Sequence, residues 1–191
     1  RLDSFAEVRE VKADGTGDRK LFKATPKGFS WDSNGEILYF SRPYTYITQI
    51  KNFNVLFYFK KGDHWTELLK KEVDGKSRGK VVDQRAFDPD VDKTGKKIVF
   101  VSNNPTGSNL LTANLNEEKT KIKTLTQLTE NNGNYVQYSS PRWSPDGKMI
   151  AVASWKIMGI VTGGRKVGQK DIFILGEDGK ELLQITSDQA S

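Results

Sequence analysis

Short runs of alternating hydrophobic and polar residues, separated by Asp-Gly or Asn-Gly pairs, recur along the chain. Residues 142–152 read Arg-Trp-Ser-Pro-Asp-Gly-Lys-Met-Ile-Ala-Val, and a second turn at Asp178-Gly179 separates the apolar runs 171–175 and 181–186. Pro-Asp-Gly is typical of a tight turn, and the β-branched and aromatic residues beside it favour strands. This segment therefore predicts two hairpins that form one four-stranded antiparallel unit.

Two earlier copies of the unit are recognisable. In the middle copy, Ala86-Phe87-Asp88-Pro89-Asp90 is followed by Gly95 and an apolar run, which we interpret as the same phrase with a four-residue insertion in its turn. The first copy runs from Ser30 to Tyr39 and turns at Asn34-Gly35. Second hairpins are expected at 54–59, with a turn at 61–63, and at 109–114, with a turn near Asn116.

Radial repetition of four-stranded sheets is the architecture of a β-propeller. The chain is predicted to be all-β and to divide into one outer hairpin and three blades, at 5–23, 24–70, 82–129 and 136–187. Closed propellers have about four to eight blades. We therefore expect an incomplete propeller, part of a ring of six to eight blades whose remaining blades come from the parent chain.

Large aromatic residues stand beside the inner turn of each copy. Trp31 and Trp143 precede their turns at the same repeat position, and we place Phe87 there in the middle copy. A large ring suits the wedge between neighbouring sheets, so these residues are expected to pack between blades.

The last unit carries the clearest family signature. Trp-Ser-Pro-Asp-Gly-Lys, followed by Asp-Ile-Phe-Ile-Leu at 171–175 and Leu-Gln-Ile-Thr at 183–186, resembles the WD-like repeat of TolB-type β-propellers. The resemblance extends over about residues 5–187. It implies a cell-envelope or periplasmic scaffold that binds a protein partner, such as a peptidoglycan-associated lipoprotein. Similar blades occur in the substrate-gating propellers of prolyl-oligopeptidase-like and tricorn-like serine peptidases. The alternative function is therefore that of a substrate-gating propeller domain in such a peptidase.

The residues needed for catalysis are not apparent in the sequence. There is no cysteine, His64 is the single histidine, and no Gly-x-Ser-x-Gly elbow is present. Residues 159–166 are spaced like a phosphate loop but lack its Lys-Ser/Thr tail, so we interpret them as a flexible loop. We expect no enzymatic activity, no catalytic residue, no cofactor and no metal site.

The net charge of +6 is spread along the chain, and acidic residues interleave with the densest basic stretch. Nucleic-acid binders usually gather positive charge on one face, so we do not expect nucleic acid as a partner. No apolar run approaches the roughly 18 residues of a membrane span, so no transmembrane segment is expected in this chain.

Long connections are expected at one end of the propeller, at 41–51, 103–108 and 154–170 and in the crossovers 69–85 and 130–140. Loops on a rigid scaffold often carry binding residues, and Tyr, Trp and Arg are enriched at interfaces. These connections supply the candidate partner-binding residues, unless their side chains only pack the loops: Arg42, Tyr44, Tyr46, Tyr135, Tyr138, Trp155, Lys156, Arg165 and Lys166.

Overall fold

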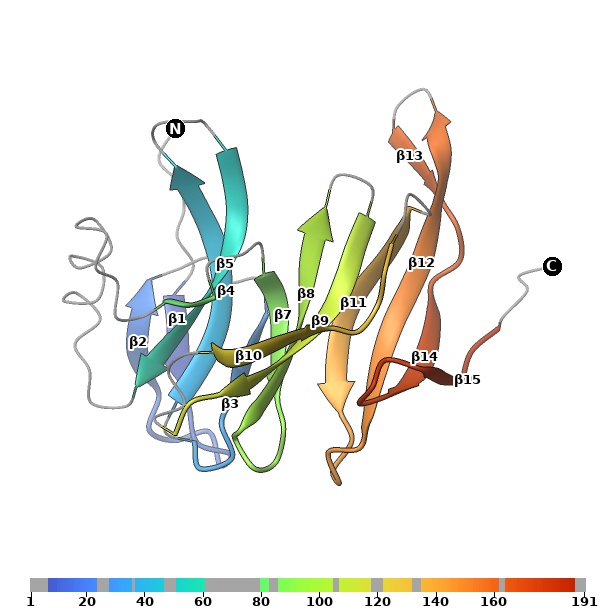
Figure 1. Cartoon of the computed structure of the whole chain (residues 1–191). Coiled ribbons are helices and arrows are strands. Elements are labelled where there is room, and N and C mark those ends of the chain that lie inside the picture. Colours follow the sequence, from blue (N-terminus) through green and yellow to red (C-terminus); the bar gives the residue numbers. More distant parts are fainter. Residues whose placement is uncertain are drawn as a thin grey trace.

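The computed structural model describes residues 7–23, 28–35, 37–46, 51–60, 80–82, 86–104, 107–117, 122–131, 135–161 and 164–187. Within them the structure has fifteen strands and no helix. The strands form one hairpin and three larger antiparallel sheets (Figure 1). The prediction of an all-β chain built from four-stranded antiparallel units is confirmed.

The N-terminal half contains the hairpin and the first sheet, whose strand order is β3-β4-β5-β6. Its strands are β1 (Glu7–Glu10), β2 (Arg19–Lys23), β3 (Phe29–Trp31), β4 (Ile37–Tyr46), β5 (Lys51–Lys60) and β6 (Lys80–Val82). The fourth strand of this sheet lies beyond residue 70, where the repeat pattern ended the blade. The turn predicted at 61–63 lies outside the described residues.

The second and third sheets have strand orders β7-β8-β9-β10 and β11-β12-β14-β15, and β13 pairs with the distal part of β12. The strands of the second sheet are β7 (Ala86–Val91), β8 (Lys97–Asn104), β9 (Gly107–Leu115) and β10 (Ile122–Gln127). Those of the third are β11 (Val136–Trp143), β12 (Met149–Val161), β13 (Gly164–Val167), β14 (Asp171–Gly176) and β15 (Glu181–Gln184).

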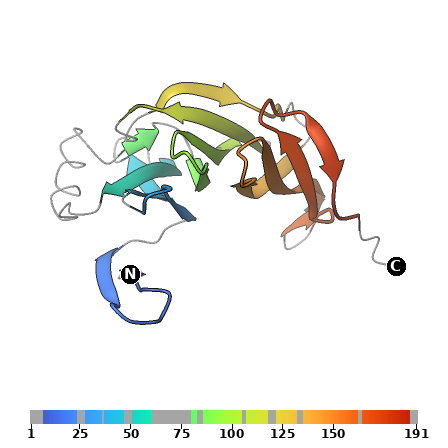
Figure 2. The same cartoon turned by 90° about the horizontal axis from the view of Figure 1, so that it is seen from below.

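The three sheets stand side by side along an open arc (Figure 2). Tight turns gather at one end, which we call the turn end: 32–37, 92–97, 144–149 and 176–180. The hairpins β4–β5, β8–β9 and β12–β13 project at the opposite end, which we call the ribbon end (Figure 1). The two ends expected from the sequence are present, but the connections expected to be long at the ribbon end are mostly paired strand.

Equivalent hydrogen bonds close the three inner turns and align the copies. The N–H groups of Asp32, Asp92 and Ser144 donate to the carbonyls five residues later, at 2.9, 3.0 and 2.8 Å. The middle turn therefore has no insertion, which corrects the sequence interpretation. Because Asp92 begins the middle turn, Val91 and not Phe87 is the equivalent of Trp143.

The misleading residue was Pro89, which lies inside β7 and not in a turn. The register of β7 on β8 shifts between Phe87 and Asp90, and Asp88 has a positive φ of 49°. Ser140 of β11 has the same conformation, with φ of 53°, beside an equivalent register shift. These are β-bulges, where a proline removes no ladder hydrogen bond.

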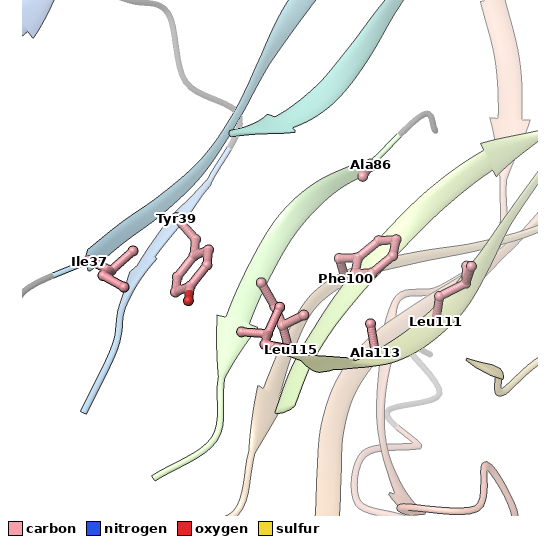
Figure 3. Packing of buried hydrophobic residues seen from close by; sticks show 8 residues of the cluster. Ile37, Tyr39, Ala86, Phe100, Leu111, Ala113 and Leu115 are labelled. Carbon is pink, nitrogen blue, oxygen red and sulfur yellow. The ribbon is translucent and has the colours of Figure 1, made fainter. Parts of the chain in front are cut away.

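The first inter-sheet core lies between β4 and the second sheet (Figure 3). Tyr39 meets Phe100 and Ile98, and all three have no exposed side-chain surface. Val91 packs against the edge of this cluster. Alternating residues of β8 thus face the first sheet, because successive strand residues point to opposite faces.

The second inter-sheet core lies between the second and third sheets. Val99, Val101 and Leu110 contact Ile150 and Val152, and each is at most 1% exposed. Trp143 and Phe87 are partly buried against this cluster, so the expected packing of Trp143 between blades is confirmed. Trp31 holds the equivalent place in the first sheet and is 38% exposed.

A row of hydrogen bonds along the innermost strands joins all three sheets. The Val91 N–H donates to Ser30 Oγ at 3.2 Å, and the Trp143 N–H donates to Asp90 Oδ2 at 2.8 Å. The Ser140 N–H donates to Asp88 Oδ2 at 3.1 Å. Each sheet thus supplies an acceptor to a backbone N–H of the next, which fixes the spacing and order of the sheets.

Candidate binding surface at the ribbon end

The predicted loop at 154–170 is a β-ribbon. Strand β12 pairs with β14 as far as Ser154 and with β11 as far as Lys156, and then continues to Val161 paired with β13. The interpretation of residues 159–166 as a flexible loop is therefore wrong, apart from 162–163, which lie outside the described residues. Branched residues on both strands favour this pairing over a loop.

The other two predicted loops are also mostly strand. Arg42, Tyr44 and Tyr46 lie in β4, opposite Val55, Phe53 and Lys51 of β5, and their side chains lie outside the described part of the chain. Strands β8 and β9 are paired up to Asn104 and Gly107. Strand pairing satisfies the backbone groups that a loop would leave to water.

The crossover from β10 to β11 is fixed to the sheets by Asn131, which is 7% exposed. Its N–H donates to Asn109 Oδ1 at 2.9 Å, and its Nδ2 donates to the Val136 carbonyl at 2.7 Å. Gly107 leaves room for this side chain, because a Cβ there would lie 1.8 Å from Asn131 Nδ2. The base of the ribbon end is thus held by buried hydrogen bonds.

Two tyrosines follow the crossover and differ in role. Tyr135 is 50% exposed, has a φ of 53°, and its carbonyl accepts the Ile157 N–H at 2.9 Å. Tyr138 is partly buried against the second inter-sheet core. Burial raises the pKa of Tyr138, and a hydrogen bond with Thr129 partly opposes this. Tyr135 can therefore meet a partner, whereas Tyr138 supports the scaffold.

Trp155 and Lys156 lie where β12 leaves the body of the sheet. The indole of Trp155 is partly buried, and Lys170 Nζ lies 5.0 Å from the centroid of its ring. This is a cation–π contact. Lys156 is exposed, and its carbonyl accepts the Gly168 N–H at 2.6 Å. Both lysines thus lie at the base of the ribbon, on either side of Trp155 in the paired strands.

Met158 was not predicted as a binding residue. The register between β12 and β13 shifts between Ile157 and Gly159, which leaves Met158 as the extra residue of a bulge. Its side chain is 65% exposed, the highest fraction among the exposed large hydrophobic residues of the described chain. The ribbon surface is therefore formed by Tyr135, Trp155, Lys156, Met158 and Lys170. A neighbouring glycine was the only sequence hint of the bulge.

Charge on the ribbon has one sign. Residues 155–170 contain Lys156, Arg165, Lys166 and Lys170 and no acidic residue. Arg165 and Lys166 lie in β13, opposite Ile160 and Gly159, and their side chains are not described. Within the described residues, no carboxylate forms an ion pair with Lys156 or Lys170.

The described residues contain no cluster of three or more His, Asp or Glu residues that could hold a metal ion. His64 lies outside them. Asp88 and Asp90, which alternate in the sequence, instead accept backbone hydrogen bonds from the third sheet. No helix in the described part of the chain is long and apolar enough to cross a membrane.

No protein-family model and no curated protein sequence matches the chain. Solved structures do match. A TolB-type protein of Agrobacterium tumefaciens superposes with a TM-score of 0.61 and 12% identity over 94% of this chain. The acylaminoacyl peptidase of Pyrococcus horikoshii gives a TM-score of 0.57 and 13% identity over 87% of this chain.

The chain spans 56% of the TolB-type structure and 26% of the peptidase. These similarities show that the chain has the β-propeller-like fold that TolB and peptidase propeller domains share. They do not distinguish the scaffold function from the peptidase-gating function, because one fold supports many activities.

Proposed function

We propose that the chain belongs to a non-enzymatic propeller scaffold that binds a protein partner through the ribbon surface. The observation that carries the proposal is the structure of this surface. The exposed Met158 and Lys156 lie on β12, and the exposed Tyr135 and Lys170 lie next to β11 and β14, beside the crossover that Asn131 holds to the sheets. A rigid support lowers the entropy cost of binding, and aromatic residues are common anchors of interfaces.

The setting we propose is a bacterial cell envelope, in the periplasm, with a peptidoglycan-associated lipoprotein or another envelope component as the partner. The support is the TolB-like repeat phrase and the superposition on a TolB-type structure. The absence of enzymatic activity is part of the proposal and is tested by assaying the purified chain for peptidase and esterase turnover.

Site-specific photocrosslinking tests the proposed function in cells that make the parent protein. A photoreactive amino acid replaces Tyr135 at the ribbon end or, as a matched control, the exposed Lys93 at the turn end. We expect a crosslink to a separate envelope protein from position 135 and none from position 93. Crosslinks from both positions, or from neither, would contradict the proposal. A crosslink from 135 to a hydrolase domain of the same polypeptide would instead support the peptidase-gating function.

A further inference from the structure

The ribbon differs in its charged residues from the turn end and from the N-terminal hairpin. At the turn end, acidic and basic residues are mixed, and their groups bond to each other: Lys97 Nζ lies 2.5 Å from Glu177 Oε2, and Lys180 Nζ lies 3.2 Å from Asp178 Oδ2. The N-terminal hairpin is similar, with Arg9 Nε 2.8 Å from Asp18. On the ribbon, Lys156 and Lys170 form no ion pair with any described carboxylate.

We infer that the partner of the ribbon surface is an acidic protein segment, whose carboxylates contact Lys156 and Lys170 while an apolar side chain covers Met158. This inference rests on the proposed function. The ribbon carries four basic residues and no acidic residue between 155 and 170. At the protein surface an interaction of this kind raises the association rate and selects the partner's charge.

The geometry favours a protein over a membrane or nucleic acid. Met158 is the only strongly exposed large hydrophobic residue among the described side chains of 156–170, so this described part offers a bilayer little apolar surface. The Trp155 ring already holds Lys170, and the ring is partly buried. It therefore lacks the open face on which a base would stack.

The carboxylates have a defined place to bind. Lys156 is exposed on β12 opposite Val136, and Lys170 Nζ lies over the ring of the preceding residue, Trp155. Met158 is two residues beyond Lys156 on the same strand. A partner segment that follows β12 outward from the base would pass the two cations first and then the apolar Met158.

The test combines charge reversal with the photocrosslink at position 135. The variant is Lys156→Glu with Lys170→Glu. The matched control is Lys93→Glu with Lys123→Glu, two exposed lysines outside the ribbon end for which no described ion pair exists. Both variants change the net charge by the same amount, from +6 to +2, since each substitution subtracts two charges. Circular dichroism and thermal unfolding of each variant check the fold.

We expect the ribbon variant to weaken capture of the crosslinked protein about tenfold or more, and the control to change it less than about twofold. Raised salt should reduce wild-type capture, because exposed charges are screened. Mass spectrometry of the crosslinked peptide should find an acidic segment.

Different failures have different meanings. Equal effects of the two variants, or a neutral or basic crosslinked segment, would overturn the inference while the proposed function stands. Absence of any protein crosslink to the wild-type chain would overturn the proposed function. A last outcome is that no protein is crosslinked and the purified chain instead binds phosphatidylglycerol vesicles or a DNA duplex. If the ribbon variant loses that binding, the basic residues recognise a different class of ligand and the inference is overturned.

Discussion

The two ends of the sheets use their polar residues in opposite ways. At the turn end, Asp92 accepts the N–H groups of Lys96 and Lys97 at 3.0 and 2.9 Å, together with the Thr94 hydroxyl at 2.6 Å. Ser144 and Asp146 are similarly engaged in the third sheet. At the ribbon end the neutral side chains of Asn109 and Asn131 bond to the backbone, and Lys156 and Lys170 form no ion pair with a described carboxylate. The turn end therefore stabilises the fold, and the ribbon end is where we propose that a partner binds.

The same contrast appears between the two tryptophans of the third sheet, Trp143 and Trp155. Trp143, beside a turn, packs on the core between sheets and has Lys97 Nζ 5.9 Å from its ring centroid. Trp155, beside the ribbon, has the same kind of cation contact but belongs to neither described core cluster. We therefore expect a substitution of Trp143 to lower stability and a substitution of Trp155 to lower partner binding.

The largest expected effect is on stability, from Trp143→Ala. Removing this indole leaves a cavity against Val99 and Ile150, so the free energy of unfolding should fall by about 3 kcal/mol. Chemical denaturation measures the loss. Trp155→Ala is the matched variant, and it should cost only about 1 kcal/mol while weakening partner capture. Equal losses from the two substitutions would remove the distinction between the ends.

Gly28→Ala tests the junction between the first two sheets. Gly28 has a φ of 89°, and a Cβ there would lie 2.8 Å from Asp88 Cα. We expect a loss of about 2 kcal/mol or more from strain and forced separation of the sheets. Gly35→Ala is the control, because Gly35 has a φ of 67° with no atom within 4 Å of the added Cβ. Thermal denaturation should show a smaller loss of stability for Gly35→Ala than for Gly28→Ala. A larger loss for Gly35→Ala would contradict the close packing of Gly28 on Asp88.

Met158→Ser should reduce binding at the ribbon end without reducing stability. The side chain is 65% exposed in a bulge, so folding gains little from it, whereas a partner would bury it. We expect partner affinity to fall about fivefold, because serine lacks the apolar side-chain atoms that the partner would bury. Titration of the crosslinking partner measures this. An unchanged affinity would exclude Met158 from the interface.

A smaller effect is expected from pH at Asp90, which joins the second and third sheets. Burial raises its pKa above the ordinary value, and the Trp143 N–H, the Arg142 charge and Ser30 oppose this. Because the folded-state pKa is raised, its contribution to stability is complete below the ordinary aspartate pKa and is lost as pH rises through the folded value. Asp90→Asn should therefore gain stability relative to wild type as pH rises through this window.

Asp146→Asn is the opposite control. Hydrogen bonds from the Ser144 hydroxyl and the Lys148 N–H lower the pKa of Asp146. Its contribution should therefore be present above the ordinary aspartate pKa and lost as pH falls through the folded value. Urea denaturation of both variants across this pH range tests the signs. The same pH trend in both would contradict the assigned environments.

Much of the fold could be predicted from the sequence because the turn chemistry repeats. Asp-Gly and Asn-Gly pairs located the hairpins near Gly15, Gly35, Gly147 and Gly179, and each of these glycines has a positive φ. The middle copy was misaligned because Asp88-Pro89-Asp90 has turn composition in a strand. This segment is a strand with a bulge and not a turn, and the position of the bulge depends on contacts with the neighbouring sheets.

The end of the fold that carries the candidate residues could be predicted from the sequence, but their secondary structure could not. Tyr135, Trp155 and Lys156 do lie at the end that the alternation of connections indicated. How far a strand extends past its neighbours depends on whether another segment pairs with it. Here β13 pairs with the distal part of β12, and the sequence did not indicate this pairing. The burial of Tyr138 and exposure of Met158 depend on packing between sheets and on a bulge, and neither has a strong local sequence signal.

Hydrogen–deuterium exchange with and without the crosslinked partner tests the central claim most directly, because it reads both ends of the sheets in one experiment. Amides at 135–138 and 155–170 should become protected when the partner binds, while those of the turns at 92–97, 144–149 and 176–180 stay unchanged. Protection confined to the turns, or spread equally over both ends, would contradict the assignment of binding to the ribbon end.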